Sequence, residues 1–201
     1  MTISVILAHP DRGSFNHAIA RVAVRALEEG GHRVRFHDLY EEGFDPVLPA
    51  GEIPRDAPLP PEVRAHCREI AEADGIVIVH PNWWGQPPAI LKGWIDRVIR
   101  PGVAYEFVDG DQGEGVPEGR LRAARALVFN TANTPADRER AVFGDPLDTL
   151  WRNCVFGLCG VGDVRRRVFG VVVVSTRDER RAWLREVAQA VREAFPAASP
   201  R

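Results

Sequence analysis

The sequence contains few of the features that would place it in a specialised class of protein. Among its 201 residues there are three cysteines and a single lysine, Lys92, and no apolar run approaches the roughly 20 residues that span a bilayer. We therefore expect no membrane insertion. Because three cysteines cannot all pair, and because Cys67, Cys154 and Cys159 each fall on an apolar position of an expected helix, we predict buried, reduced thiols.

The charge balance and the first residues exclude further classes. The chain has 26 basic and 28 acidic side chains, a formal net charge of −2, which gives no general attraction to nucleic acid or to an anionic membrane surface. The opening residues MTISVILAHP lack the basic start and cleavage site of a signal peptide and are predicted to form a strand. We expect a cytoplasmic protein that does not bind nucleic acid.

Several nucleotide-binding and catalytic motifs are also missing. The sequence contains neither the dinucleotide fingerprint G-x-G-x-x-G nor the phosphate-binding loop G-x-x-x-x-G-K-[ST], and no G-x-S-x-G of hydrolases. Adjacent His66 and Cys67, and the spacing of five between Cys154 and Cys159, match no common zinc pattern. We predict no metal site.

Apolar runs and helical periods alternate from one end of the chain to the other, which favours an α/β fold. Runs that are apolar throughout are typical of parallel strands covered by helices on both faces. The length suits one doubly wound domain, and we assign residues 1–201 to it. The five expected strands are Ile3–Ala8, Arg33–Leu39, Gly75–His80, Arg125–Thr131 and Arg167–Ser175.

The segments between these strands supply the expected helices and two long loops. A Pro-rich loop covers residues 45–61, and a Gly-rich acidic segment, 102–120, is predicted to form a hairpin or an excursion. Thr176 and Glu179 have the spacing of a capping box at the start of the last helix. The other helices are expected to carry Phe15 to Leu27, Val63 to Ala71, Leu91 to Ile99 after Pro88, and Leu147 to Leu158 after a cap at Asp145.

In a doubly wound sheet, ligands bind beyond the carboxyl ends of the strands, where the strand order reverses. The loops at that edge read AHPDRGSFNHA, HPNWWGQPPA and NTANTPADRE. Ser14 stands where a helix begins, so it either caps that helix or lies where unpaired backbone N–H groups attract a phosphate. His9 is either a ligand or a structural histidine at a strand end.

The second of these loops contains two adjacent tryptophans. Trp94 falls on the apolar face of the following helix and is predicted to be core, whereas Trp83 and Trp84 lie in the turn before it. Large apolar groups in a turn either line a pocket for a flat ring or pack against a second subunit. The residues alone leave both alternatives open.

The motifs AHP…SFN and HPNWWGQPPAILKGWIDRV, with RNCVFGLCGV near the end, closely resemble the flavodoxin-like NAD(P)H:quinone oxidoreductase family and its bacterial relatives. The resemblance spans most of the chain, and its pattern P-x-x-W…PAxLKGWxDRV is long and specific. It implies a flavodoxin-like doubly wound sheet of five parallel strands in the order 2-1-3-4-5. It also implies a tightly bound flavin and a homodimer with the active site at the interface.

The same resemblance implies a set of cofactor-binding residues and assigns none as a catalytic acid or base. It places the flavin's phosphate and ribityl chain near the first loop and the isoalloxazine ring against the second loop, and the third loop completes the binding site. One departure is that the Tyr and His which quinone-reducing members carry after the fourth strand are missing from NTANTPADRERAVFGDP. The implied residues are His9, Ser14, Phe15 and Asn16; Pro81, Asn82, Trp83, Trp84 and Gly85; and Thr131, Asn133 and Thr134.

We therefore predict an NAD(P)H dehydrogenase (quinone)-like flavoenzyme that uses FMN, with FAD as the alternative. NAD(P)H would give a hydride to flavin N5 and leave, and a quinone or similar small acceptor would then take two electrons at the same site. One alternative is a flavin-binding accessory subunit of a membrane transport system, docked through residues 45–61 or 105–119. Another is a flavodoxin-like electron carrier, although such carriers are usually more acidic.

Overall fold

Five parallel strands form the central sheet of the protein. The structure, a computed structural model, describes residues 1–107, 115 and 117–197. The strands stand in the order β2-β1-β3-β6-β7, which is 2-1-3-4-5 along the chain, so the predicted flavodoxin-like sheet is confirmed. Their bounds are β1 (Thr2–Leu7), β2 (Arg33–Asp38), β3 (Gly75–Pro81), β6 (Arg125–Thr131) and β7 (Asp163–Phe169).

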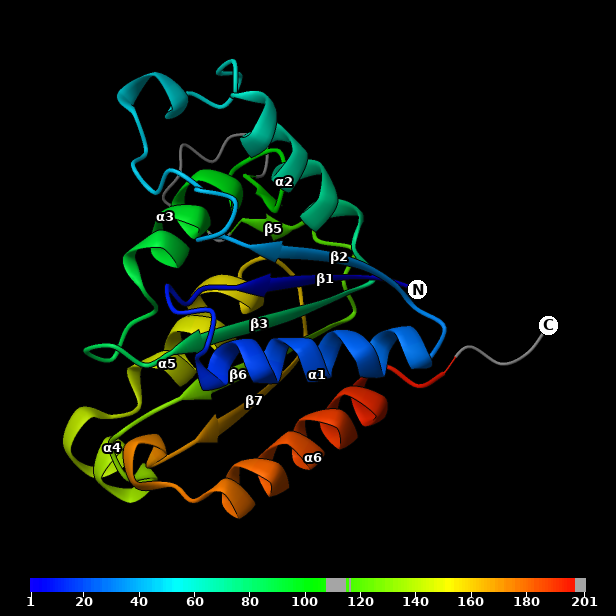
Figure 1. Ribbon diagram of the computed structural model, residues 1–201. Helices are drawn as coiled ribbons and strands as arrows, with labels where there is room; N and C mark the ends of the chain where they lie inside the picture. The colour runs from blue at the N-terminus through cyan, green and yellow to red at the C-terminus, as the bar shows by residue number, and fades with distance from the viewer. Residues whose placement is uncertain (108–114, 116, 198–201) are drawn as a thin grey trace.

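Helices cover both faces of this sheet, as Figure 1 shows. On one face α1 (Phe15–Glu29) and α6 (Arg177–Ala194) pack side by side over a core that contains Phe129 and Phe169. The other face is covered by α2 (Pro61–Glu72), α3 (Ala89–Val98), α5 (Pro146–Thr149) and the π-helix η2 (Leu150–Gly157).

The three central strands are mostly apolar because both of their faces are buried. Alternate residues point to opposite sides of the sheet, so Val77 and Val79 join the α1–α6 core while Ile76 and Ile78 join the other. Each such side chain stabilises the fold by about 1.5–3 kcal/mol. The continuous apolar runs that predicted these strands follow directly from this double burial.

The prediction for the last strand was wrong. The expected strand was Arg167–Ser175, but β7 is Asp163–Phe169, and Val172–Val174 form the short 3-10 helix η3. Val173 and Val174 are exposed. Because β7 is an edge strand, its outer positions accept arginines, and hydrophobicity is a poor guide to where such a strand begins.

The region between β6 and β7 also differs from the prediction. Residues 136–143 form a helix that was not expected, α4 (Ala136–Phe143), and the single helix expected after Asp145 is divided into α5 and η2. The side chain of Asp145 makes no capping bond; its backbone is left-handed, with φ of 49°, and its carboxylate pairs with Arg166.

The cysteine prediction is correct for two of the three residues. Cys67 and Cys159 are buried, but Cys154 is exposed on η2, and all three are free thiols. A π-helix turns its side chains through a different angle per residue from an α-helix, so the helical spacing placed Cys154 on the wrong face.

Two shorter predictions are confirmed. The Gly-rich segment contains an antiparallel pair, β4 (Tyr105–Glu106) with β5 (Glu118–Gly119), although residues 108–114 and 116 lie outside the described residues. Thr176 and Glu179 form the expected capping box of α6. None of the helices in the described part of the chain is long and apolar enough to cross a membrane.

Candidate functional site

Three loops meet at the carboxyl edge of the sheet. They follow β1, β3 and β6, and backbone hydrogen bonds fix their starting points. The N–H of Ala8 donates to Val79 O at 3.0 Å, and the N–H of Asn82 donates to Thr131 O at 2.7 Å. The chain passes from β1 to β2 on one side and returns to β3 on the other, so this is the point at which doubly wound sheets bind ligands.

The first loop ends in a capped helix start. Ser14 Oγ accepts from the N–H of His17 at 3.3 Å, so the capping interpretation of Ser14 is correct. In the described part of the chain, the backbone N–H groups of Phe15 and Asn16 have no hydrogen-bond partner. Helix N-termini of this kind attract anions, so capping and phosphate binding are compatible here.

The side chains of Asn16 and His17, in the first turn of α1, make hydrogen bonds to neighbouring parts of the chain. Asn16 is buried, and its Nδ2 donates to Thr131 Oγ1 at 2.9 Å, which ties α1 to the end of β6. His17, which the sequence did not single out, links Ser14 Oγ at 3.0 Å to Asp38 Oδ2 at 2.9 Å. Because these bonds occupy the side chains of Asn16 and His17, the two residues support the first loop.

Phe15 and His9 occupy different environments. The ring of Phe15 packs against Trp183, with ring centroids 5.8 Å apart, so only its backbone can face a ligand at this edge. His9 lies beside Trp83, with centroids 6.0 Å apart. Burial lowers the pKa of His9, which makes the neutral ring the main form at pH 7.

The second loop is a tight turn from Trp83 to Gln86. The N–H of each of these two residues donates to the carbonyl of the other at 3.0 Å. Trp84 and Gly85 have φ of 57° and 71°, the two left-handed residues of a type I′ turn. Asn82 Oδ1 fastens the turn by accepting from the N–H of Gly85 at 2.9 Å.

This turn presents an indole to solvent. The side chain of Trp84 is fully exposed and that of Trp83 is 41% exposed, whereas Trp94 is buried in the core as predicted. Because the turn is held by its own hydrogen bonds, the exposure of Trp84 is built into the backbone. An indole held in this way suits contact with a flat ring or with another chain.

A cavity of about 580 Å³ opens beside the turn. This volume is in the range of small-molecule sites. Of the predicted residues, five line it, while His9, Ser14, Phe15, Asn16, Pro81, Trp83 and Thr131 do not. Its walls are Asn82, Trp84, Gly85, Gln86, Ala132, Asn133, Thr134, Glu139, Phe143 and Pro146.

A buried polar network surrounds His80, near the end of β3 and just before the turn. Its Nδ1 donates to Pro81 O at 2.8 Å, and its Nε2 accepts from Trp151 Nε1 at 2.9 Å and from Asn130 Nδ2 at 2.8 Å. Complete burial lowers the pKa of His80 to about 4, so the ring is neutral and its tautomer is fixed. Pro81 is therefore a support for the turn rather than part of the cavity.

Comparison with known proteins identifies the family. The model of the family described as the flavodoxin-like fold matches residues 1–193. The chain belongs to the flavodoxin-like fold family. An uncharacterized NAD(P)H oxidoreductase of Haemophilus influenzae is 33% identical over 189 residues, covering 92% of this chain and 91% of the relative.

Two further relatives of this flavodoxin-like chain are similar over most of their length. The ribosyldihydronicotinamide dehydrogenase [quinone] of Mus musculus is 28% identical over 209 residues, which is 93% of this chain and 89% of the relative. The solved NAD(P)H:quinone oxidoreductase from Methanothermobacter marburgensis has a TM-score of 0.82 and 28% identity, with 96% of each chain covered. The resemblance found in the sequence is thus confirmed.

The structure of this family member adds residues that the sequence did not reveal. Glu139 and Phe143 reach the cavity from α4, and Glu139 Oε1 accepts from Asn82 Nδ2 at 3.0 Å. α4 has no buried residue, so it lacks the apolar periodicity by which the sequence would have signalled it. A capping glycine, Gly144, was the available signal.

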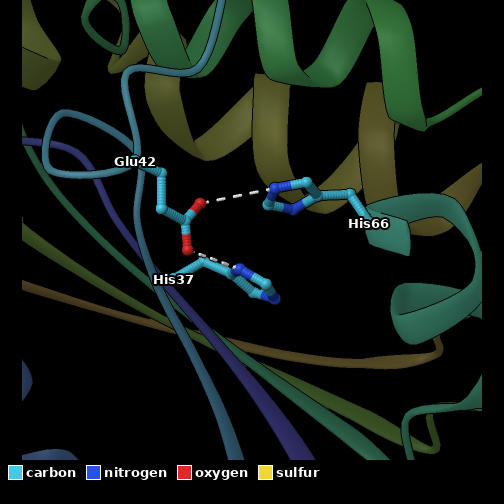
Figure 2. A group of neighbouring side chains, drawn as sticks. All are labelled: His37, Glu42 and His66. Atoms are coloured by element: carbon cyan, nitrogen blue, oxygen red, sulfur yellow. Dashed lines mark hydrogen bonds and ion pairs between the residues drawn. The ribbon is translucent and has the colours of Figure 1, made fainter. Parts of the chain in front are cut away.

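A second polar cluster lies at the carboxyl end of β2, where His37 and His66 approach Glu42 (Figure 2). Glu42 Oε1 is 2.8 Å from His37 Nδ1, and Glu42 Oε2 is 3.4 Å from His66 Nε2. Two imidazoles and a carboxylate are ligands that zinc accepts, so the protonation of the rings decides whether a metal fits.

Protonation argues against a metal here. Trp94 Nε1 lies 3.2 Å from His66 Nδ1 and can only donate, so His66 carries its proton on Nε2, the atom that a metal would need. His37 also faces Glu69 Oε2 at 3.0 Å through Nε2. Burial alone would lower its pKa, but the bonds to Glu42 and Glu69 outweigh burial and raise it. The raised pKa favours an imidazolium at His37 that is ion-paired with the two carboxylates, and an imidazolium does not bind a metal.

Proposed function

We propose that this protein is an FMN-dependent NAD(P)H oxidoreductase that passes a hydride from NAD(P)H, via flavin N5, to a quinone or similar small acceptor. The observation that carries the proposal is the cavity at the carboxyl edge of the sheet, which lies between the turn after β3, with its fixed, exposed indole, and the loop that follows β6. Sheets of this strand order bind FMN where the strand order reverses, between β1 and β3, which favours FMN over FAD.

The residues present fit a flavin nucleotide. The unpartnered N–H groups of Phe15 and Asn16, at the start of α1, suit its phosphate, and the cavity beside Trp84 suits a flat ring. Trp84 also has no hydrogen-bond partner on its backbone in the described part of the chain, whereas the N–H of Gly85 is already bonded to Asn82. Polar contacts to the ring are therefore expected at Trp84, Asn133 and Thr134.

The bound flavin would supply the two-electron chemistry, and the protein would supply position and polarity. Asn82 and the Trp83–Gln86 pair hold the turn still, and the neutral His80 network just before it keeps Pro81 in place. A single open cavity admits one partner at a time, which favours a ping-pong order in which NAD(P)H leaves before the acceptor enters. No acid or base is needed for the hydride itself.

The remaining expectations belong to the same proposal. Exposed apolar side chains lie at and near the cavity: Phe143, which lines it, is 53% exposed, and Val173, whose N–H donates to Asn133 Oδ1 at 3.0 Å, is 70% exposed. A second copy of the chain covering them would make a homodimer with the site at its interface. The relatives named as NAD(P)H oxidoreductases and quinone dehydrogenases support the activity, and we propose the cytoplasm as its location.

The test is an absorption spectrum of the purified protein, followed by heat release and chromatography of whatever is bound. We expect a flavin spectrum that bleaches when NAD(P)H is added without oxygen and returns when a quinone is added, and release of FMN. The variant Asn16→Ala should lose flavin, while Asn153→Ala, on the exposed side of η2, should keep it. A colourless protein that neither FMN nor FAD reconstitutes would rule out the proposal.

A further inference from the structure

We propose that the cavity beside the Trp83–Gln86 turn selects its electron acceptor by charge, and that Glu139 makes it prefer cationic flat rings to anionic ones. This inference rests on the proposed function, because it concerns the acceptor that the cavity would hold. Of the ten residues that line the cavity in the described part of the chain, Glu139 is the one that carries a charge at neutral pH. The charge of this wall is therefore negative.

The contacts of Glu139 favour its ionised form. Oε1 accepts from Asn82 Nδ2 at 3.0 Å, and Glu139 lies in the first turn of α4, where the helix N-terminus stabilises a negative charge. The other carboxylate oxygen has no partner among the described residues, so it is available to a ligand. Because Glu139 is half-buried, water and salt screen its charge less than they screen an exposed carboxylate.

Two aromatic side chains give the cavity walls that suit a flat cation. Glu139 and Phe143 stand four residues apart, so they lie on the same face of α4, and both line the cavity. Trp84 lines it from the turn after β3, and the rings of Phe143 and Trp84 are both exposed. The faces of such rings attract cations, and the carboxylate adds to this attraction. An anionic ring would meet repulsion from the same groups.

The arginines of this region do not pair with the Glu139 carboxylate. Arg140 and Arg166 line a separate, smaller cavity of about 120 Å³, and Arg166 is paired there with Asp145. Glu139 lines both cavities, but no ion pair joins it to either arginine in the part of the chain that the structure describes. Arg138 is exposed and lines neither cavity. The negative charge is thus not cancelled at the wall of the larger cavity.

A cationic ring also suits the electron transfer. When a flat cation such as a phenothiazinium dye takes the hydride that NAD(P)H supplies through the flavin, a ring N–H bond forms and the electron pair enters the ring. The hydride brings both the electrons and the hydrogen, so the positive charge is cancelled and no further proton is needed. The neutral product is no longer attracted to the Glu139 carboxylate, which favours its release.

The first experiment compares three naphthoquinones on the flavin-loaded protein: neutral menadione, one with a sulfonate group and one with a trimethylammonium group. The kcat/KM of each charged acceptor is divided by that of menadione, and the ratios are compared between proteins, which removes intrinsic reactivity. In Glu139→Gln, whose amide oxygen can still accept from Asn82, the cation ratio should fall and the anion ratio should rise, each by about 10-fold through KM. Asp137→Asn removes a charge from an exposed position of the same helix and should leave both ratios unchanged.

A binding measurement adds a readout that does not depend on turnover. The ring-methylated nicotinamide cation and the nicotinate anion are similar in size, and equilibrium dialysis gives their dissociation constants on the flavin-loaded protein. The cation should bind more tightly in the wild type, and the two should bind about equally in Glu139→Gln.

Equal charge ratios in the wild type and Glu139→Gln would overturn the inference. The same loss in Asp137→Asn would also overturn it, because the general surface charge would then be responsible. A wild type without flavin, or without turnover of any acceptor, would instead contradict the proposed function.

Discussion

At the scale of single residues, the turn beside the cavity depends on one glycine. Gly85 has φ of +71°, and a Cβ there would lie 2.7 Å from Pro146 Cγ. We expect Gly85→Ala to lower the free energy of unfolding by about 3 kcal/mol, because left-handed strain and a clash act together, and to weaken flavin binding.

Gly144 provides the matched control for this change. Its φ is also +71°, but a Cβ there would meet nothing within 4 Å. Gly144→Ala should therefore cost only the backbone strain, about 1 kcal/mol. Both values can be measured by urea denaturation, and equal losses in the two variants would show that the contact with Pro146 is unimportant.

His37 gives a residue-scale prediction for pH. Its pKa is raised in the folded protein above the usual 6.5, so its protonation stabilises the fold fully below pH 6.5, and this contribution is lost as pH rises through the raised value. The free energy of unfolding should decline over that window in the wild type. His37→Gln, which cannot be protonated, should lack this decline; a parallel decline in both proteins would contradict the assignment.

At the scale of elements, the Pro-rich loop is fixed by one buried ion pair. Arg97 on α3 makes two bonds to Glu52 in the short helix η1 (Ala50–Glu52), at 2.9 and 2.6 Å, and donates to Asp45 O at 2.6 Å. Both side chains are buried. This pair joins the loop to the helix that follows the tryptophan turn.

Breaking that pair should be costly, because an unpaired charge would be left inside the protein. We expect Glu52→Ala to reduce the free energy of unfolding by about 3–5 kcal/mol. The exposed pair between Lys92 and Asp96, one turn apart on the same helix, is the comparison, and Asp96→Ala should cost less than about 1 kcal/mol. Similar losses in the two variants would show that burial of Arg97 does not matter.

The sequence predicted best those elements that are buried on both faces. β1, β3 and β6 lie in the middle of the sheet, and their apolar runs identified them. β7, at the edge, carries Arg165 and Arg167 on exposed positions, so its pattern is ambiguous. α4 buries nothing, and its sequence gave no periodic signal.

At the scale of the whole molecule, the site was only partly predictable for the same reason. The motifs located the three loops, because strand ends converge wherever a parallel sheet forms. They did not separate residues that line the cavity, such as Asn133, from those that support it, such as Asn16 and Pro81, because that distinction depends on side-chain bonds across the chain. Glu139 was missed because it approaches from the unpredicted helix.

The assembly of the molecule gives a further prediction. If a second copy covers the apolar side chains around the cavity, sedimentation velocity should give twice the mass of one chain at micromolar concentration. The fluorescence of Trp84 should then shift to shorter wavelength as the protein is concentrated, because its indole, fully exposed in one chain, would leave water. A single-chain mass at all concentrations would remove the dimer from the proposal.

The attachment of α4 has a consequence for how this protein changes over generations. The helix forms one wall of the cavity, yet it contributes no residue to either core, and a side-chain bond between Glu139 and Asn82 joins it to the turn. Substitutions along its length can therefore accumulate with little loss of folding stability. If a new electron acceptor is selected for, in nature or in a mutant library, α4 can vary while the loops that follow β1, β3 and β6 stay the same.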